Sequence, residues 1–113
     1  MQKPRPKKLH ALLNKKMSLY RRTTVKNSFG EPVETDVKVC DLWVALWPIS
    51  AKEHIQSDRE TMEISHRIRI RYRSGITQGM VFKLGSREFE ITQGPINVNE
   101  DNRLIDFVVK ERV

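Results

Sequence analysis

The stretch "MEISHRIRIRYR", residues 62–73, alternates apolar and polar side chains without a break. Because successive side chains of a β-strand point to opposite faces, this pattern predicts a strand with one buried and one exposed face. Arginine occupies the last four positions of the polar face. The buried face is expected to hold Met62, Ile64, His66, Ile68, Ile70 and Tyr72, and the polar face Glu63, Ser65, Arg67, Arg69, Arg71 and Arg73.

Other strand patterns lie on both sides of this stretch. Ser50 is followed three residues later by Glu53, which is the spacing of a capping box and predicts a short helix or ordered turn over 50–60. The fold class is therefore mainly β, a small antiparallel β-barrel or sandwich of about six strands with one short helix. The remaining strands are expected over residues 17–25, 39–49, 80–84, 87–93 and 103–112, with a tight glycine turn at 85–86.

The length of 113 residues indicates one domain with a modest core. Residues 1–14 begin with two prolines among basic residues, and we expect them to form a disordered N-terminal arm. The folded domain is expected to span 15–113. Inside it, residues 25–37 contain Gly30 and Pro32 and are expected to form a mobile loop, which at this length is more often functional than accidental.

The net charge of +7 is concentrated at the N-terminus. Residues 1–22 contain eight lysines and arginines and no acid, so residues 23–113 carry a net charge of −1. A basic arm of this kind can bind phosphate through counterion release, although a solvated tail explains the same composition. The candidate phosphate-contacting residues of the arm are Lys3, Arg5, Lys7 and Lys8.

The sequence also indicates where the protein is made. No apolar run reaches the roughly 20 residues needed to cross a bilayer, and the N-terminus lacks the apolar core of a signal peptide. The single cysteine, Cys40, cannot form an internal disulfide. We therefore expect a soluble protein that is synthesised in the cytoplasm.

No residue pattern points to catalysis or to a cofactor. The three histidines are His10, His54 and His66, and none has a second metal ligand at the usual spacing. The chain has no phosphate-binding glycine loop and no nucleophile motif. We expect a protein that is not an enzyme, with no metal and no cofactor.

The arginine stripe needs a source of negative charge. Like charges two residues apart on a strand lie roughly 7 Å from each other and repel unless something neutralises them. Within the chain Glu63, Glu88 and Glu90 are the favoured partners, and a partner protein or nucleic-acid phosphates are the alternatives. Arginine rather than lysine at all four sites favours bidentate or stacked contacts.

Residues 39–91, "VCDLWVALWPISAKEHIQSDRETMEISHRIRIRYRSGITQGMVFKLGSREFEI", resemble the bacteriophage head-tail joining family, whose members are also called head-tail adaptors, head-completion proteins or stoppers. The matching features are a tryptophan-containing strand that ends in Pro48-Ile49-Ser50, the arginine stretch and the glycine hairpin "LGSREFEI". The resemblance extends over roughly residues 15–112. The basic first 14 residues go beyond the usual start of the family.

The resemblance implies a structural virion protein, made in the bacterial host, that lies at the head-tail interface. Family members form a dodecameric ring between the portal or adaptor ring and the tail, and packaged DNA passes through its channel without sequence-specific contacts. In some members a long loop closes the channel. The candidate residues of that loop here are Lys26, Asn27, Phe29, Gly30, Glu31 and Pro32.

The two tryptophans of residues 39–49 are candidate interface residues. Family members often carry an acid at the position of Leu46 and a small residue at the position of Trp47. Trp43 and Trp47 are therefore expected to contact another subunit or the tail. In a ring, Arg67–Arg73 are expected to contact neighbouring subunits or the channel. We expect a monomer in isolation. The alternative function is a stand-alone β-barrel that binds nucleic acid without sequence preference.

Overall fold

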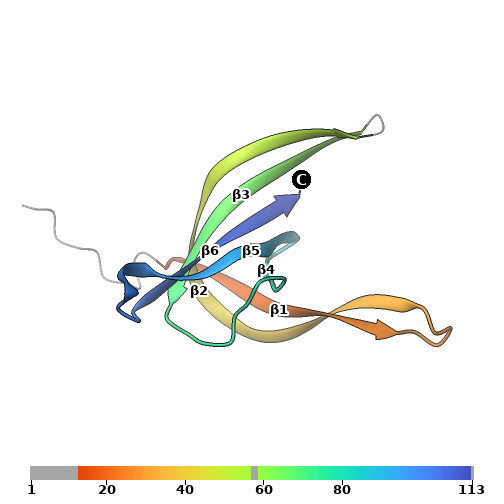
Figure 1. Cartoon of the computed structure of the whole chain (residues 1–113), viewed down its shortest axis with the longest axis horizontal. Coiled ribbons are helices and arrows are strands. Elements are labelled where there is room, and N and C mark those ends of the chain that lie inside the picture. The colour runs from red at the N-terminus through yellow and green to blue at the C-terminus, as the bar shows by residue number, and fades with distance from the viewer. Residues whose placement is uncertain (1–12, 57–58, 113) are drawn as a thin grey trace, which may run out of the picture.

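The computed structural model describes residues 13–56 and 59–112, and within them the chain forms an antiparallel sheet of six strands (Figure 1). Its only helical element in this part of the chain is a short 3₁₀ turn. The mainly β prediction is therefore confirmed. The elements are β1 (Lys15–Lys26), β2 (Pro32–Gln56), β3 (Arg59–Arg71), β4 (Val81–Leu84), β5 (Arg87–Asn97), η1 (Val98–Glu100) and β6 (Leu104–Arg112).

The sheet closes on itself in the order β1-β2-β3-β6-β5-β4. β4 completes the closure by pairing with β1 through Ser18–Lys83, Leu19–Phe82 and Tyr20–Val81. This seam is much shorter than the pairing of β1 with β2, which extends over the full length of β1. The closed sheet therefore depends on a narrow contact between β1 and β4.

The core lies inside the closed sheet. The alternation of β3 is confirmed, since His66, Ile68 and Ile70 are buried whereas Arg67 and Arg69 are only half-buried on the other face. Tyr72 is exposed, because β3 ends at Arg71 before this position is reached. The fully buried side chains that fill most of the interior are Phe82, Phe89, Phe107, Met17, Leu19, Ile91 and Val109.

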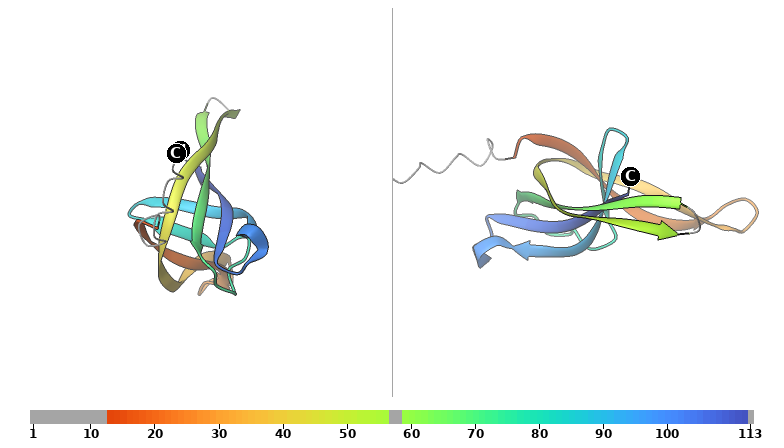
Figure 2. Two further views of the ribbon diagram at one scale, coloured as in Figure 1. Left: turned by 90° about the vertical axis from the view of Figure 1, so that its left-hand side faces the viewer. Right: turned by 90° about the horizontal axis from the view of Figure 1, so that it is seen from above.

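Two hairpins project from the closed sheet, and both contain β2. Residues up to Val44 of β2 pair with β1, and residues from Ala45 onward pair with β3. Figure 1 shows the β1–β2 and β2–β3 hairpins extending toward the same side of the molecule, away from η1, and the right-hand view of Figure 2 agrees. The long strand β2 therefore contributes one strand to each of the two hairpins.

The predicted short helix over 50–60 is wrong. β2 continues as a strand to Gln56 and pairs with β3 from Ala51–Ile64 to Gln56–Arg59. Pro48 does not end the strand, because the register shifts between Pro48 and Ser50 and such an irregularity tolerates a residue without an N–H donor. Pairing with β3 outweighs the local capping-box spacing.

The loop predicted over 25–37 is also much shorter in the structure. β1 extends to Lys26 and β2 begins at Pro32, with Val25 opposite Val33. Only residues 27–31 form the connection between the strands. Cross-strand pairing of β-branched residues explains why this Gly- and Pro-containing segment is mostly extended. Similarly, β5 runs on to Asn97 across an irregularity near Pro95, beyond the strand predicted over 87–93.

Replacement of Gly94 by alanine is expected to destabilise the protein by about 2–3 kcal/mol. Gly94 has a φ of +113°, and a Cβ there would lie 2.9 Å from the carbonyl oxygen of Asp106 and 3.0 Å from the ring of Phe107. Chemical unfolding measures the loss. The matched control is Gly85→Ala, where φ is +60° but the space is open, and about 1 kcal/mol is expected. Equal losses for the two variants would contradict the close approach at Gly94.

Candidate functional site

The two tryptophans and three of the four arginines singled out in the sequence lie on one outer face of the closed sheet, whereas Arg73 follows the end of β3. Pairing places Trp47 opposite Arg67 and Ala45 opposite Arg69. Trp43 shares the outward parity of Ala45 and Trp47, since Val44 between them is fully buried. We call the set Trp43, Trp47, Arg67, Arg69 and Arg71 the arginine–tryptophan face.

Asp106 of β6 neutralises part of this face. Its carboxylate is 2% exposed and accepts hydrogen bonds from Arg69, with Nε to Oδ1 at 2.7 Å and Nη2 to Oδ2 at 2.9 Å. Arg67 Nε lies 3.2 Å from Oδ2 of the same carboxylate. The hydrogen bond to Asp106 raises the pKa of Arg69. Asp106 points outward on its strand but is buried beneath the two guanidinium groups.

The prediction that glutamates neutralise the arginine stripe is wrong for the described residues. Glu63 pairs instead with Lys110 at 2.9 Å. Glu88 lies 3.4 Å from Arg22 and 3.5 Å from Lys83. Register explains the difference, because β3 lies beside β6 and not beside β5. The one acid in the otherwise apolar "LIDFVV" segment, residues 104–109, was the signal in the sequence that pointed to Asp106.

The remaining part of the arginine–tryptophan face is open to solvent. Trp43 is 58% exposed, and Arg71 is exposed with no ion pair in residues 13–56 and 59–112. Arg73, beyond the end of β3, is likewise exposed and has no ion pair in these residues. Trp47 is half-buried, and the guanidinium carbon of Arg69 lies 5.5 Å from the centre of its ring. Exposed tryptophan beside arginine is the composition typical of protein–protein contacts.

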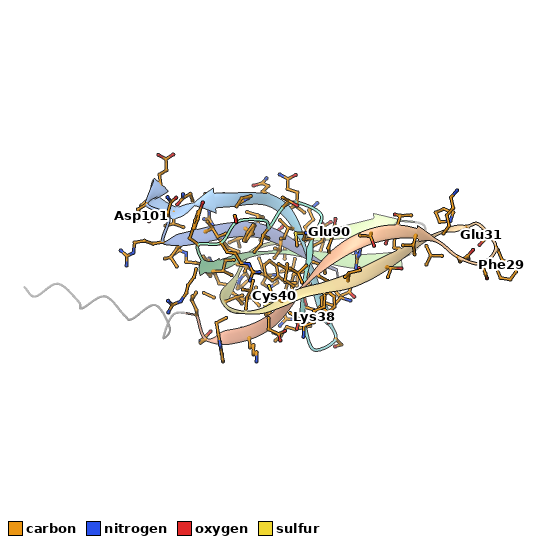
Figure 3. The ribbon with its side chains drawn as sticks, turned by 90° about the horizontal axis from the view of Figure 1, so that it is seen from below. Phe29, Glu31, Lys38, Cys40, Glu90 and Asp101 are labelled. Carbon is orange, nitrogen blue, oxygen red and sulfur yellow. The ribbon has the colours of Figure 1, made fainter. Side chains whose placement is uncertain are left out.

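The candidate loop residues form the tip of the β1–β2 hairpin. Asn27 organises the turn, since its Oδ1 accepts hydrogen bonds from the backbone N–H groups of Phe29 and Glu31 at 2.9 and 3.0 Å. Gly30 has a φ of +78°, which glycine adopts without strain. The Phe29 side chain is 87% exposed. Figure 3 shows Phe29 and Glu31 at this end of the molecule and Asp101 at the opposite end.

The two faces of the β1–β2 hairpin differ in chemistry. On one face Arg22 donates to Asp36 at 2.9 Å, and Lys83 of β4 lies 2.8 Å from the same carboxylate. The hydrogen bond from Arg22 is the main reason why the pKa of Asp36 lies far below its usual range. On the other face Val25, Val33 and Val37 are exposed. The charged face is thus satisfied within the chain, whereas the valine face is not covered.

The remaining candidate features of the sequence concern the N-terminal arm, metal binding, membrane insertion and Cys40. The arm residues Lys3, Arg5, Lys7 and Lys8 lie outside the described residues. In the described part of the chain, no group of His, Cys, Asp and Glu is arranged to hold a metal ion. The same part contains no helix long and apolar enough to span a membrane. Cys40 is a free thiol packed against the core.

A pH-dependent stability is expected from His66. The ring is 5% exposed, packs edge-on against Phe89 at 5.2 Å, and has Nε2 3.9 Å from Glu111, which is itself held by Arg87. Burial lowers the pKa of His66 below 6.5, and the attraction of Glu111 only partly offsets it. As pH falls through 6.5 the unfolded chain takes up a proton that the folded chain does not, so stability falls.

Chemical unfolding at about pH 7.5 and about pH 5.5 measures this effect. The free energy of unfolding is expected to be lower at the acidic pH, and the difference should shrink in His66→Gln. Glu111 contributes little in this range, because its pKa is lowered by the hydrogen bond from Arg87 and it stays ionised. An unchanged difference in His66→Gln would show that other groups cause it.

The family described as phage head completion protein matches residues 10–112, nearly the whole chain. The chain belongs to this family. The resemblance noted in the sequence is therefore confirmed. As a phage head completion protein, the chain has a structural role in completing the phage head, as a virion component next to other head or tail proteins.

Solved structures support the fold of this head completion protein. A chain from the virion of a native gene transfer agent particle matches with a TM-score of 0.73 at 15% identity, over 88% of this chain and 94% of that one. The solution structure of a Shigella flexneri 2a protein matches with a TM-score of 0.59 at 21% identity, over 85% and 89% of the two chains. No curated protein is significantly similar in sequence.

Proposed function

We propose that this head completion protein assembles as a ring between the portal or adaptor ring and the tail. The observation that carries the proposal is the exposed apolar surface along β2 and at the tip of the β1–β2 hairpin, which includes Phe29, Val37, Trp43 and Ile49. A soluble monomer gains nothing from such a surface, whereas a subunit that is covered by neighbours does. The gene transfer agent chain of the same fold is itself part of a virion, which supports this placement.

The arginine–tryptophan face is, in this proposal, a contact with a neighbouring subunit or ring rather than with DNA. Two of its arginines are already held by Asp106, which reduces the positive charge available for phosphates. Trp43 adds a large apolar area beside them. A channel through which DNA slides also gains little from a tight cationic contact. The ring is proposed to be dodecameric in the virion and to form from monomers.

The tip of the β1–β2 hairpin is proposed to narrow the DNA channel of the ring. The hairpin extends beyond the closed sheet, and its tip carries the exposed residues Lys26, Phe29, Gly30, Glu31 and Pro32. Hydrogen bonds between Asn27 and the backbone of Phe29, Gly30 and Glu31 fix the conformation of the turn. The tip therefore has a defined shape with which to occupy a channel. Shortening the hairpin should leave the closed sheet folded but release packaged DNA from heads.

Complementation of phage that lack the gene tests this function. Without the protein, DNA-filled heads should accumulate without tails or lose DNA, and the wild-type chain should restore infectious particles seen by electron microscopy. Trp43→Ala should restore fewer particles than Tyr72→Ala, which alters a similarly exposed aromatic residue. Normal tailed particles without the protein would contradict the proposal. The alternative function, a stand-alone nucleic-acid-binding protein, requires the isolated chain to retard DNA with a steep salt dependence.

A further inference from the structure

A small apolar hollow lies at the end of the arginine–tryptophan face. It has a volume of about 240 Å³ and is lined by Leu13, Asn14, Trp43 and Arg71. Pockets for drug-sized ligands have volumes of roughly 300–1,000 Å³, so this hollow suits a single side chain rather than a ligand. The Leu13 side chain forms a buried wall, while Trp43 and Arg71 are exposed. The hollow therefore combines an aromatic wall with one unpaired positive charge in the described residues.

The tip of the β1–β2 hairpin has the complementary chemistry. Phe29 is the most exposed of the large apolar side chains of the described residues. Glu31, two residues further on, is also exposed and has no ion pair in residues 13–56 and 59–112. Because Asn27 binds the backbone N–H groups of both residues, the aromatic ring and the carboxylate are presented on a preformed turn.

The tip cannot reach the hollow of its own chain. Lys15, beside the lining residue Asn14, and Lys26, beside the tip, are the two ends of β1. An extended strand rises about 3.3 Å per residue, so the eleven steps between them span about 35 Å. Figure 3 agrees, since Phe29 lies far from Asp101, which is near the start of β6 where Leu104 pairs with Arg71. A contact between tip and hollow therefore requires two copies.

We propose that Phe29 of one copy inserts into the hollow of the next copy, with Glu31 paired to Arg71 of that copy. The occupant of the hollow is thus a second copy of this chain. Phe29 packs against Trp43 and Leu13, an aromatic contact typical of the buried centre of interfaces. The carboxylate of Glu31 supplies the counter-charge that Arg71 lacks in the described part of the chain.

This contact is heterologous, since tip and hollow are different surfaces at opposite ends of one chain. Repeating a heterologous contact produces a ring when the rotation closes. The inference rests on the proposed ring and specifies which surfaces meet in it. A hairpin whose tip binds the next copy can still narrow the channel. The proposed narrowing of the channel and the proposed contact therefore need separate experiments.

Photo-cross-linking in assembled particles tests the contact directly. Phe29 is replaced by p-benzoyl-phenylalanine, which keeps an aromatic side chain at the tip, and particles are irradiated. A dimer is expected on a denaturing gel, with mass spectrometry placing the new bond in residues 13–15 or at Trp43. The same replacement at Tyr72, which lines a different hollow, is the control and should not label these residues. Labelling of a tail or portal protein from position 29 would overturn the proposal.

Charge reversal is a second test. Residues 31 and 71 that only maintained the fold would not show recovery when both charges are reversed together. Glu31→Arg and Arg71→Glu should each lower the yield of the cross-linked dimer by about tenfold, because each places like charges together. The double variant restores opposite charges, and its yield should return to within about twofold of wild type. Both side chains are exposed, so thermal unfolding of the single variants should match wild type. Single variants with normal yield, or a double variant without recovery, would disprove the pairing.

Failure of this contact can be distinguished from failure of the proposed function. If the protein is needed for tailed particles but position 29 does not cross-link to the hollow, the contact between tip and hollow is wrong, and the proposed function is not contradicted. If Trp43→Ala disrupts particles while Phe29→Ala does not, the hollow binds a different occupant. If the protein is absent from particles, the proposed function itself is wrong.

Discussion

Phe107→Ala is expected to lower the free energy of unfolding by about 3–5 kcal/mol, the largest effect of any substitution considered for this protein. Phe107 is fully buried on β6, and its ring lies 6.0 Å from that of Phe82 on β4. These two strands are not neighbours in the sheet. The pair therefore joins two strands that do not hydrogen-bond to each other, and loss of the Phe107 ring leaves a cavity in the core between them.

Urea or guanidinium unfolding, followed by tryptophan fluorescence, measures this loss. Phe107→Leu keeps most of the buried apolar area and should cost clearly less than alanine. Tyr72→Ala, which removes an exposed aromatic residue, should change stability by no more than about 0.5 kcal/mol. If Phe107→Ala were as stable as Tyr72→Ala, the interior described here would be incorrect.

The second large effect is expected for Asp106→Ala, at about 3 kcal/mol. The substitution removes the carboxylate that binds Arg67 and Arg69, so two positive charges on adjacent outward positions of β3 would face each other unpaired. The expected loss of stability is at the lower end of the range for breaking a buried ion pair. The reason is that the side chains of Arg67 and Arg69 are both about one-third exposed, so water can hydrate their charges.

Asp106→Asn is the informative companion, since it keeps the size of the side chain and removes its charge. It should be destabilised nearly as much as the alanine variant if charge neutralisation is the cause, and much less if packing is the cause. Arg71→Ala serves as the control on the same strand. Arg71 has no ion pair to lose in the described part of the chain, so a change within about 0.5 kcal/mol is expected.

The sequence predicted the elements whose pattern directly reflects burial. The alternation predicted the two faces of β3 correctly over residues 66–71, because a strand covered on one side must place its apolar residues at every second position, but it wrongly placed Tyr72 on the buried face. The glycine turn at 85–86 was also predicted correctly, since the β4–β5 hairpin closes there.

Long-range pairing explains what the sequence could not predict. Pro48 and the Ser50–Glu53 spacing indicate the end of a strand locally, but β3 supplies a partner that extends β2 to Gln56. Likewise, Asp106 became the counter-ion of the arginines because β6 lies beside β3. Neither neighbour relation can be read from local composition. The placement of Trp43 beside Arg71 has the same origin, since these residues lie on different strands.

The continuity of β2 limits how the length of this chain can change. One strand pairs with β1 up to Val44 and with β3 from Ala45, so the in-out phase of one hairpin is fixed relative to that of the other. One residue inserted between these two positions would turn every side chain of one hairpin to the opposite face, unless a new bulge absorbed it, whereas two inserted residues would preserve the phase. Insertions and deletions at this point of the strand are therefore expected to be tolerated in even numbers.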